Sequence, residues 1–295
     1  MDWVVNMIKG FSSWKEYEGA SEGSGRSEKI WLVNPVNGDI GLFKFPKTEH
    51  TTEHLSEIIA ADIAALINVE CMKVELGEYD SRLGSLSYRI NKEDENLIEG
   101  IQLINKYYPL YNEQNLYDCE RDEYYSLEMI VHSLEEYDLQ KDFLDIPIFD
   151  FLIGNTDRHQ SNWAVLQRDK SLKLCSLYDN GSSLCCYIPE SQLDSYLGND
   201  RLRLQSLVDS KSKSRIRVNK KLKKEPTHLE VLHFLRVNHY NDVIEIVIKI
   251  KDNINEYNID SILDKYVSLM SAKRIILIKR FLLEKVRLMA RQFNL

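Results

Sequence analysis

The sequence has 295 residues, which is enough for one large domain or for two closely packed lobes. Hydrophobic residues make up 43% and charged residues 28%, the proportions of a globular protein with a buried core, and the formal net charge of −8 excludes a general polyanion binder. Five scattered cysteines without a CxxC pair indicate a reduced, cytoplasmic protein, and no apolar run reaches the ~18 residues that a membrane span needs.

Residues 1–95 are expected to form a small lobe that is rich in strands. Short β-type runs are separated by turn sequences such as the one at 34–39, and one segment has an apolar face at helical spacing. The expected elements of this lobe are strands at 29–33, 40–45, 72–76 and 84–90 and a helix at 52–67.

Residues 96–295 have a mostly helical pattern. The expected elements are helices at 123–139, 143–152, 227–237, 240–250 and 271–292, interrupted by strand-like pieces at 163–166 and 172–178. A small β-rich lobe joined to a larger helical lobe is an α+β arrangement with a cleft between the lobes, and such clefts are where ligands usually bind.

The loop at 154–162 carries the first candidate catalytic residues. It follows an apolar helix and precedes a strand, so both its ends are held by the core. Asp157 and Asn162 are five residues apart, the spacing of a kinase catalytic loop, in which the Asp accepts the hydroxyl proton and the Asn binds Mg²⁺. Asp179 comes where the second strand-like piece ends, and Mg²⁺ prefers such a carboxylate together with an amide oxygen, phosphates and water. Asn, Asp and Gly are also ordinary turn formers, but two such turns, each joined to an apolar element, favour a site.

The segments Ile153-Gly-Asn-Thr-Asp-Arg-His…Asn162 and Leu177-Tyr-Asp-Asn-Gly181 resemble the signatures of the HipA-like serine/threonine kinases, bacterial toxin-type proteins with a divergent kinase fold. The resemblance extends more weakly over most of the chain. It implies a bilobal, protein-kinase-like fold, with Asp157 as the catalytic base and with Asn162 and Asp179 as the Mg²⁺ ligands.

Other parts of the motif, and some departures from the family, bear on function. Arg158 and His159 match the motif, and His159 is either a structural hydrogen-bonding residue or a catalytic one. The best-known members carry an additional N-terminal subdomain, for which this chain is expected to be too short. Several members inhibit themselves by phosphorylating a loop serine. An ungapped register places Glu22 there, with Ser21 and Ser24 beside it, so this form of control is not assigned.

The small lobe offers candidates for binding the ATP phosphates. The Gly- and Ser-rich segment 18–27, which includes Ser24 and Gly25, would let backbone N–H groups approach phosphates, although a flexible linker has the same composition. In the resembled family a lysine in a Lys-Phe-Pro context binds the nucleotide phosphates, and this assigns the role to Lys44. Alternatively, Lys44 is a residue on an edge strand that serves only solubility.

A kinase lysine normally pairs with a glutamate on a helix. Glu57 is the first choice because the segment 56–64 is similar to the family's first helix. Glu53, one turn earlier, is the second choice, and an ordinary solvated carboxylate is the alternative for either. Lys29, at the end of the Gly-rich segment, is a further candidate to face the phosphates.

The run 211–224 contains eight Lys or Arg among fourteen residues and no acid. It is either a solvated segment or a contact for an acidic protein substrate, a phosphorylated segment or nucleic acid in a complex. Because it lacks the interleaved aromatics of a single-strand platform, direct nucleic-acid binding is not expected. Related kinases keep a similar Ser/Arg-containing segment, which favours a place near the cleft.

The leading hypothesis is phosphoryl transfer from Mg-ATP to a Ser or Thr hydroxyl of a protein, with ATP and Mg²⁺ as cofactors. The alternatives are a nucleotide-binding regulatory pseudokinase and a kinase that acts on a lipid or small molecule. The resemblance also implies a toxin of a toxin–antitoxin system. Its substrate would be a translation factor or an aminoacyl-tRNA synthetase, and its partner a DNA-binding antitoxin.

Overall fold

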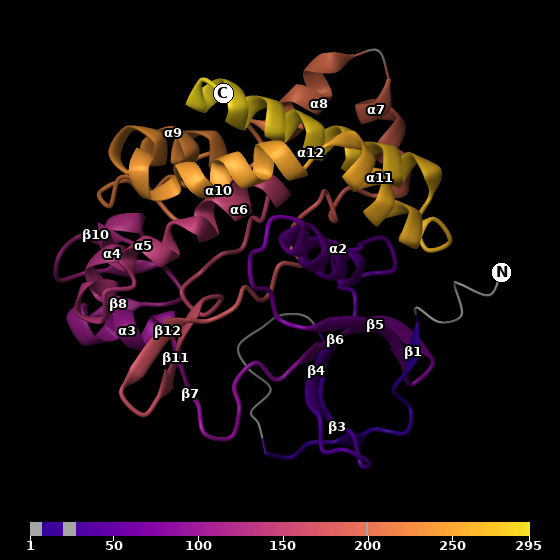
Figure 1. The fold of residues 1–295 in the computed structure, drawn as a ribbon, viewed down its shortest axis with the longest axis horizontal. Coiled ribbons are helices and arrows are strands. Elements are labelled where there is room, and N and C mark those ends of the chain that lie inside the picture. Colours follow the sequence, from indigo (N-terminus) through magenta and orange to yellow (C-terminus); the bar gives the residue numbers. More distant parts are fainter. Residues whose placement is uncertain (1–7, 20–27, 199) are drawn as a thin grey trace.

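The computed structural model describes residues 8–19, 28–198 and 200–295 and shows a mixed α+β fold of two lobes (Figure 1). The first lobe is built on a six-stranded sheet in which β1 pairs with β5 in parallel and every other pairing is antiparallel. In sheet order its strands are β1 (Lys9–Gly10), β5 (Val74–Tyr79), β6 (Arg82–Tyr88), β4 (Ile40–Lys44), β3 (Lys29–Val33) and β2 (Lys15–Glu16).

The alternation of side chains along β4 gives the first sheet two different faces. Phe43 is fully buried and packs with Phe11, Leu32 and Leu86 in a small core that belongs to this lobe alone. Lys44 is the next residue in the strand, so its side chain projects from the opposite face. The expected strands at 29–33 and 40–45 are confirmed, and those at 72–76 and 84–90 correspond to β5 and β6 with shifted ends.

Helix α2 (Glu53–Leu66) confirms the helix expected at 52–67 and lies between the two lobes (Figure 1). Its apolar side chains, among them Ile59 and Ile63, join the main core of the protein. The helix contacts β5 and β6 of the first lobe and α11 (Glu256–Leu263) of the second. Helix α2 is therefore held by both lobes.

The second lobe contains two small antiparallel sheets and most of the helices. Its strands are β7 (Asn96–Glu99), β11 (Ala164–Arg168) and β12 (Ser171–Leu174) in one sheet and β8 (Tyr111–Asn112), β9 (Tyr117–Asp118) and β10 (Glu123–Tyr124) in the other. Its other helices are α3 (Gly100–Tyr107), α4 (Leu127–Leu134), α5 (Gln140–Phe143), α6 (Asp145–Ile153), α7 (Leu193–Leu197), α8 (Arg201–Val208), α9 (His228–Asn238), α10 (Tyr240–Asn253) and α12 (Ala272–Phe293).

Two expectations for this lobe need correction. The helix expected at 123–139 is shorter, because residues 123–124 pair with β9 and the Ser126 hydroxyl caps α4 by accepting the Met129 N–H. The strand expected at 172–178 ends at Leu174. Beyond it the chain crosses toward the first lobe, where Leu177 forms a parallel bridge with Cys71. The other four expected helices and the strand at 163–166 are confirmed within a few residues of their ends.

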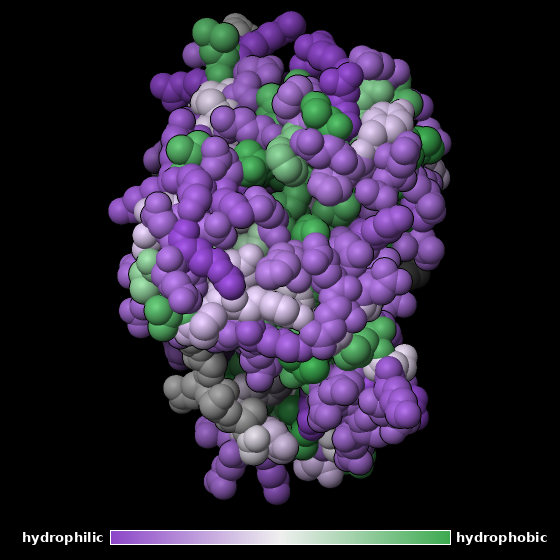
Figure 2. Space-filling model, turned by 90° about the vertical axis from the view of Figure 1, so that its left-hand side faces the viewer, coloured by the Kyte–Doolittle hydropathy of each residue, from purple (hydrophilic) through white to green (hydrophobic). Residues whose placement is uncertain are grey.

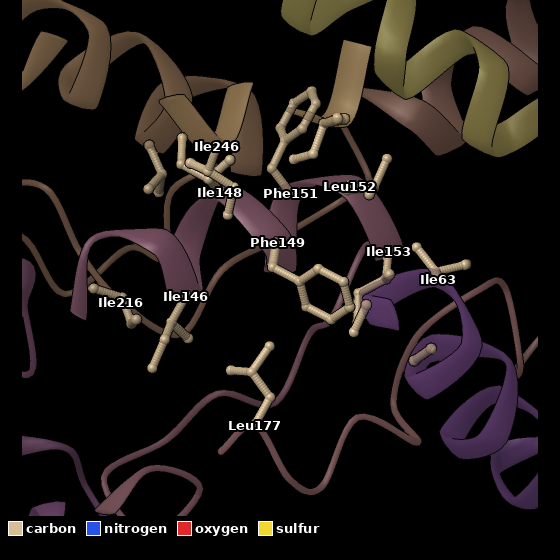
Figure 3. Close-up of a cluster of buried hydrophobic side chains, with 14 of the residues drawn as sticks. Ile63, Ile146, Ile148, Phe149, Phe151, Leu152, Ile153, Leu177, Ile216 and Ile246 are labelled. Atoms are coloured by element: carbon tan, nitrogen blue, oxygen red, sulfur yellow. The ribbon is translucent and has the colours of Figure 1, made fainter. Parts of the chain in front are cut away.

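Helix α6 occupies the centre of the core, and Figure 3 shows its side chains pointing in several directions. Ile148 lies beside Ile246 of α10, while Ile153 faces Ile63 of α2. Such all-round burial fixes the end of α6, from which the loop at 154–162 begins.

The outside of the protein is largely polar on the side that is drawn in Figure 2, where hydrophobic side chains form small separate groups. Of the helices in the described part of the chain, none combines the length and the apolar composition that crossing a membrane requires.

Candidate active site

The loop at 154–162 starts at a backbone position that favours glycine. Gly154 ends α6 with φ of +68°, in the left-handed region, and a Cβ there would lie 2.7 Å from Cζ of Phe281. The next residue, Asn155, donates its N–H to the Asp150 carbonyl at 3.0 Å, and its side-chain oxygen accepts the N–H of Asp157 at 3.0 Å. The backbone of the loop is thus held by its own hydrogen bonds.

Arg158 joins the two sequence motifs from inside the core. Its side chain is only 1% exposed and forms an ion pair with Asp150, with Nε and Nη2 at 3.0 and 2.9 Å from the carboxylate. Nη1 donates to the carbonyls of Asn162 and Tyr178 at 2.7 Å, and Nη2 donates to Oδ1 of Asn180 at 2.6 Å. Burial disfavours the charged guanidinium, but the Asp150 carboxylate outweighs this and raises the pKa of Arg158.

Sequence reasoning did not find Asp150. The available signal was a single acid within the apolar run Ile148-Phe-Asp-Phe-Leu-Ile153. A charged residue in such a run is rarely buried unless it is paired, and here Arg158 is its partner. Arg158 therefore holds the site in place and does not reach into the cleft.

Asp157 and Asn162 lie together in the loop. The Asn162 side chain is 5% exposed, and its Nδ2 donates to the backbone carbonyl of Asp157 at 2.8 Å. The Asp157 side chain is 37% exposed, so its carboxylate is accessible to solvent. His159 fits a structural role, because its Nδ1 accepts the N–H of Ser161 at 3.2 Å and burial lowers its pKa.

Lys44 and Asp179 face one another across the lobes, with Nζ 2.7 Å from Oδ1. Asp179 has φ of 54°, a left-handed conformation that Asp tolerates better than most residues. Burial by itself disfavours the charged carboxylate, but the charge and hydrogen bond of Lys44 outweigh it and lower the pKa of Asp179 to about 2. Asp179 is therefore ionised at neutral pH.

Glu57 lies near Lys44 and Asp179 but does not form the expected ion pair with Lys44. Its carboxylate is 2% exposed and accepts the backbone N–H of Asn180 at 2.8 Å, while Lys44 makes its ion pair with Asp179. The turn passes close to this carboxylate, since a Cβ added at Gly181 would lie 3.1 Å from Oε2 of Glu57. Burial raises the pKa of Glu57, although the nearby charge of Lys44 acts in the opposite direction. Glu57 thus fixes the turn that carries Asp179.

The remaining candidates of the small lobe are placed differently. Lys29 stands directly opposite Lys44 in the β3–β4 register, so both side chains project from the same face of the sheet. Ser24 and Gly25 lie outside the described residues. Glu53 begins α2, and both of its carboxylate oxygens are buried without a hydrogen-bond partner in the described part of the chain.

The donors near Asp157 are compatible with Mg²⁺. Because Nδ2 of Asn162 is held by a backbone carbonyl, the amide oxygen is the atom left to coordinate a cation. Asp179 supplies an ionised carboxylate. Mg²⁺ is usually bound by one or two carboxylates together with phosphate oxygens and water, which fits these two donors. Among the described residues, no group of three or more His, Cys, Asp or Glu is placed to hold a metal.

Comparisons with known proteins show the family and the fold. The family described as the HipA-like C-terminal domain matches residues 22–254. The serine/threonine-protein kinase CtkA of Helicobacter pylori is 26% identical over 172 residues, which cover 55% of this chain and 51% of that protein. The match thus spans about half the length of this curated relative.

Two solved structures are similar in fold. The proinflammatory kinase CtkA of Helicobacter pylori superposes with a TM-score of 0.80 at 19% identity and covers 97% of each chain. HipA in the toxin–antitoxin complex of Shewanella oneidensis with HipB and operator DNA gives a TM-score of 0.56 at 11% identity over 94% of this chain and 66% of that one. The chain has a bilobal, kinase-like fold and belongs to the HipA-like C-terminal domain family.

Proposed function

We propose that this protein transfers the γ-phosphoryl group of Mg-ATP to a Ser or Thr hydroxyl of a protein. The observation that carries the proposal is that two features lie side by side where the two lobes meet. Asp157 is an accessible carboxylate on a rigid loop, and beside that loop Lys44 lies 2.7 Å from the ionised Asp179. The similarity to a protein described as a serine/threonine-protein kinase supports the choice of acceptor.

In this proposal the residues act mainly by position and charge. Bound Mg²⁺ would neutralise charge on the phosphates. Asn162 and Asp179 would hold it, and Lys44 would shift from Asp179 to the phosphate oxygens. Asp157 would orient the acceptor hydroxyl and take its proton while the new O–P bond forms and the bond to ADP breaks. Arg158 keeps these groups at fixed distances without touching the substrate.

Replacement of the proposed base tests the assignment. We expect Asp157→Asn to reduce transfer of labelled γ-phosphate at least ~100-fold, the usual contribution of general acid–base catalysis, and to leave binding of a non-hydrolysable ATP analogue intact. Asp94→Asn is the matched control, because Asp94 is a half-exposed carboxylate paired with Arg168 on the surface. Transfer by Asp157→Asn at the parental rate would show that the assignment is wrong.

The same assay distinguishes the alternatives. Mg-dependent nucleotide binding without transfer to any acceptor would indicate a regulatory pseudokinase. Labelled product in the lipid or small-molecule fraction would indicate a different acceptor.

The biological setting is proposed from the family. The relative of Shewanella oneidensis is described in a complex with HipB and operator DNA. We extend this to a DNA-binding antitoxin partner and to a toxin that phosphorylates a translation factor or an aminoacyl-tRNA synthetase in the cytoplasm. Phosphoproteomics of cells that express the parent or Asp157→Asn tests the substrate, and affinity purification of the parent tests the partner.

A further inference from the structure

The basic run 211–224 is not a solvated segment over its first half. Ser212, Ser214 and Ile216 are buried, whereas the residues between them are at least partly exposed. Ile216 is 0% exposed and belongs to the buried cluster around α6 (Figure 3). This alternation turns Lys211, Lys213 and Arg215 toward one side.

The buried residues of this segment have specific partners. The Ser212 hydroxyl lies 2.8 Å from Nζ of Lys285 and 2.8 Å from Nδ1 of His228. Lys213 and Arg217, which flank residues 214–216, form single β-bridges to Thr227 and to Ser126. The outward side chains therefore project from a backbone that is fixed in position.

Arg215 is the member of this segment that reaches the proposed catalytic base. Its Nε lies 3.4 Å from Oδ1 of Asp157, and its Nη1 lies 2.7 Å from Oε1 of Glu225. The side chain is 40% exposed, so an incoming group can approach it. A guanidinium has five N–H donors in a planar fork, and these two contacts leave others for an additional acceptor.

The neighbouring lysines differ in how far their charge is already neutralised. Lys220 is paired with Glu123 and Glu128, at 3.1 and 2.5 Å. Within the described part of the chain, Lys211 and Lys213 make no ion pair with an acid. Arg215 is thus the member of the segment that contacts Asp157, and Lys211 and Lys213 carry further positive charge at alternate positions of the same segment.

We propose that Arg215, with Lys213 and Lys211 behind it, binds acidic side chains of the protein substrate, so that hydroxyls flanked by Asp or Glu are preferred as acceptors. This inference rests on the proposed kinase function. Alternate residues of an extended chain are ~7 Å apart, which is also the spacing of alternate side chains in an extended substrate segment. A carboxylate at Arg215 would hold the neighbouring hydroxyl next to Asp157.

A library of peptides with a central Ser or Thr and varied flanking residues tests this specificity. With the parent, we expect kcat/KM for peptides with Asp or Glu flanks to exceed that for Asn or Gln flanks by roughly tenfold, as for a hydrogen-bonded charge pair. Arg215→Gln should bring this ratio of kcat/KM values close to one, and Arg215→Lys should keep part of the preference. The ratio is measured within one variant, so a general loss of rate cancels.

Charge reversal provides the matched pair of variants. Lys213→Glu should turn the preference toward Lys-flanked peptides. Lys221→Glu makes the same charge change in the same run but at a side chain that donates to the carbonyls of Arg121 and Asp122, and it should keep the parental ratio.

The proteins of a cell lysate are also tested as acceptors, with the same preparation of the parent protein. Transfer to the lysate proteins or the library without an acidic preference overturns the inference on specificity alone. No transfer to any acceptor overturns the proposed function itself.

Discussion

Arg158, which belongs to the loop at 154–162, and Arg215, which contacts that loop, have very different surroundings. Arg158 is 1% exposed and bonds to Asp150 and to three other groups, so its charge is compensated within the core. Arg215 is 40% exposed and is shared between Asp157 and Glu225. Solvent weakens the exposed ion pairs of Arg215, so a substrate carboxylate can take their place. The ion pair of Arg158 and Asp150 is shielded from water, so neither charge can be solvated if the other is removed.

Removal of Arg158 should be costly because it would leave the Asp150 carboxylate buried and unpaired. We expect Arg158→Met to lower the free energy of unfolding by about 3–5 kcal/mol. Arg168→Met is the control: Arg168 pairs with Asp94 at side chains that are 57% and 53% exposed, and the loss should stay below about 1 kcal/mol. Urea unfolding of both variants gives the comparison, and equal losses would contradict it.

At the scale of elements, α12 supports the segment that carries Arg215. Lys285 projects from α12 into the core and is 0% exposed. Its Nζ donates to Ser212 and lies over the rings of Phe151 and Phe281, 4.4 and 5.2 Å from their centroids. A hydroxyl and two ring faces compensate little of the cost of burying an ammonium group.

This burial makes stability depend on pH. It lowers the pKa of Lys285 from its ordinary 10.5 to about 7. Between these values the unfolded chain binds one proton more than the folded chain, so folding becomes more favourable as the pH rises through 7. Relative to Lys285→Met, the parent should gain up to ~1.4 kcal/mol of unfolding free energy per pH unit between pH 7.5 and 9.

Denaturant unfolding at several pH values measures this difference. The control is Lys279→Met, on the same helix, because Lys279 pairs with Glu256 and Asp260 and its pKa is raised. The free energy of unfolding of Lys279→Met should change with pH in parallel with that of the parent between pH 7.5 and 9. A Lys285→Met curve that is also parallel to the parent would show that Lys285 remains charged in the fold.

Hydrophobic periodicity predicted the elements whose burial has a regular pattern. The helix at 271–292 was found because an apolar stripe recurs along it, and it corresponds to α12. Periodicity did not reveal that Lys285 is buried, since a lysine within a long helix has no local sign of its partner. The contact of Arg215 with Asp157 joins residues that are 58 positions apart, so only the folded arrangement reveals it.

For the molecule as a whole, the candidate site is also a junction between the lobes. Lys44 comes from β4 and Glu57 from α2, yet both hold the turn at 179–180, which belongs to the chain of the second lobe. Leu177 adds backbone hydrogen bonds to residues 70 and 72. A ligand that binds Lys44 and Asp179 together would therefore stabilise the lobes relative to each other.

Nucleotide binding should consequently raise the melting temperature of the whole protein, and Mg²⁺ should be required for the full effect. A ligand at 100 times its Kd stabilises the folded state by ~2.7 kcal/mol, which corresponds to a shift of several degrees for a chain of this size. We expect this shift with a non-hydrolysable ATP analogue and Mg²⁺, and a smaller one when EDTA removes the metal.

Asp179→Asn should lose the difference between the Mg²⁺ and EDTA conditions, because an amide binds Mg²⁺ more weakly than a carboxylate does. Asp94→Asn, at a surface pair, should keep it. If Asp179→Asn kept the full Mg-dependent shift, Asp179 would serve only to position Lys44, and the metal would have to bind through other residues. The two variants thus separate a metal ligand from a structural ion pair at the junction of the lobes.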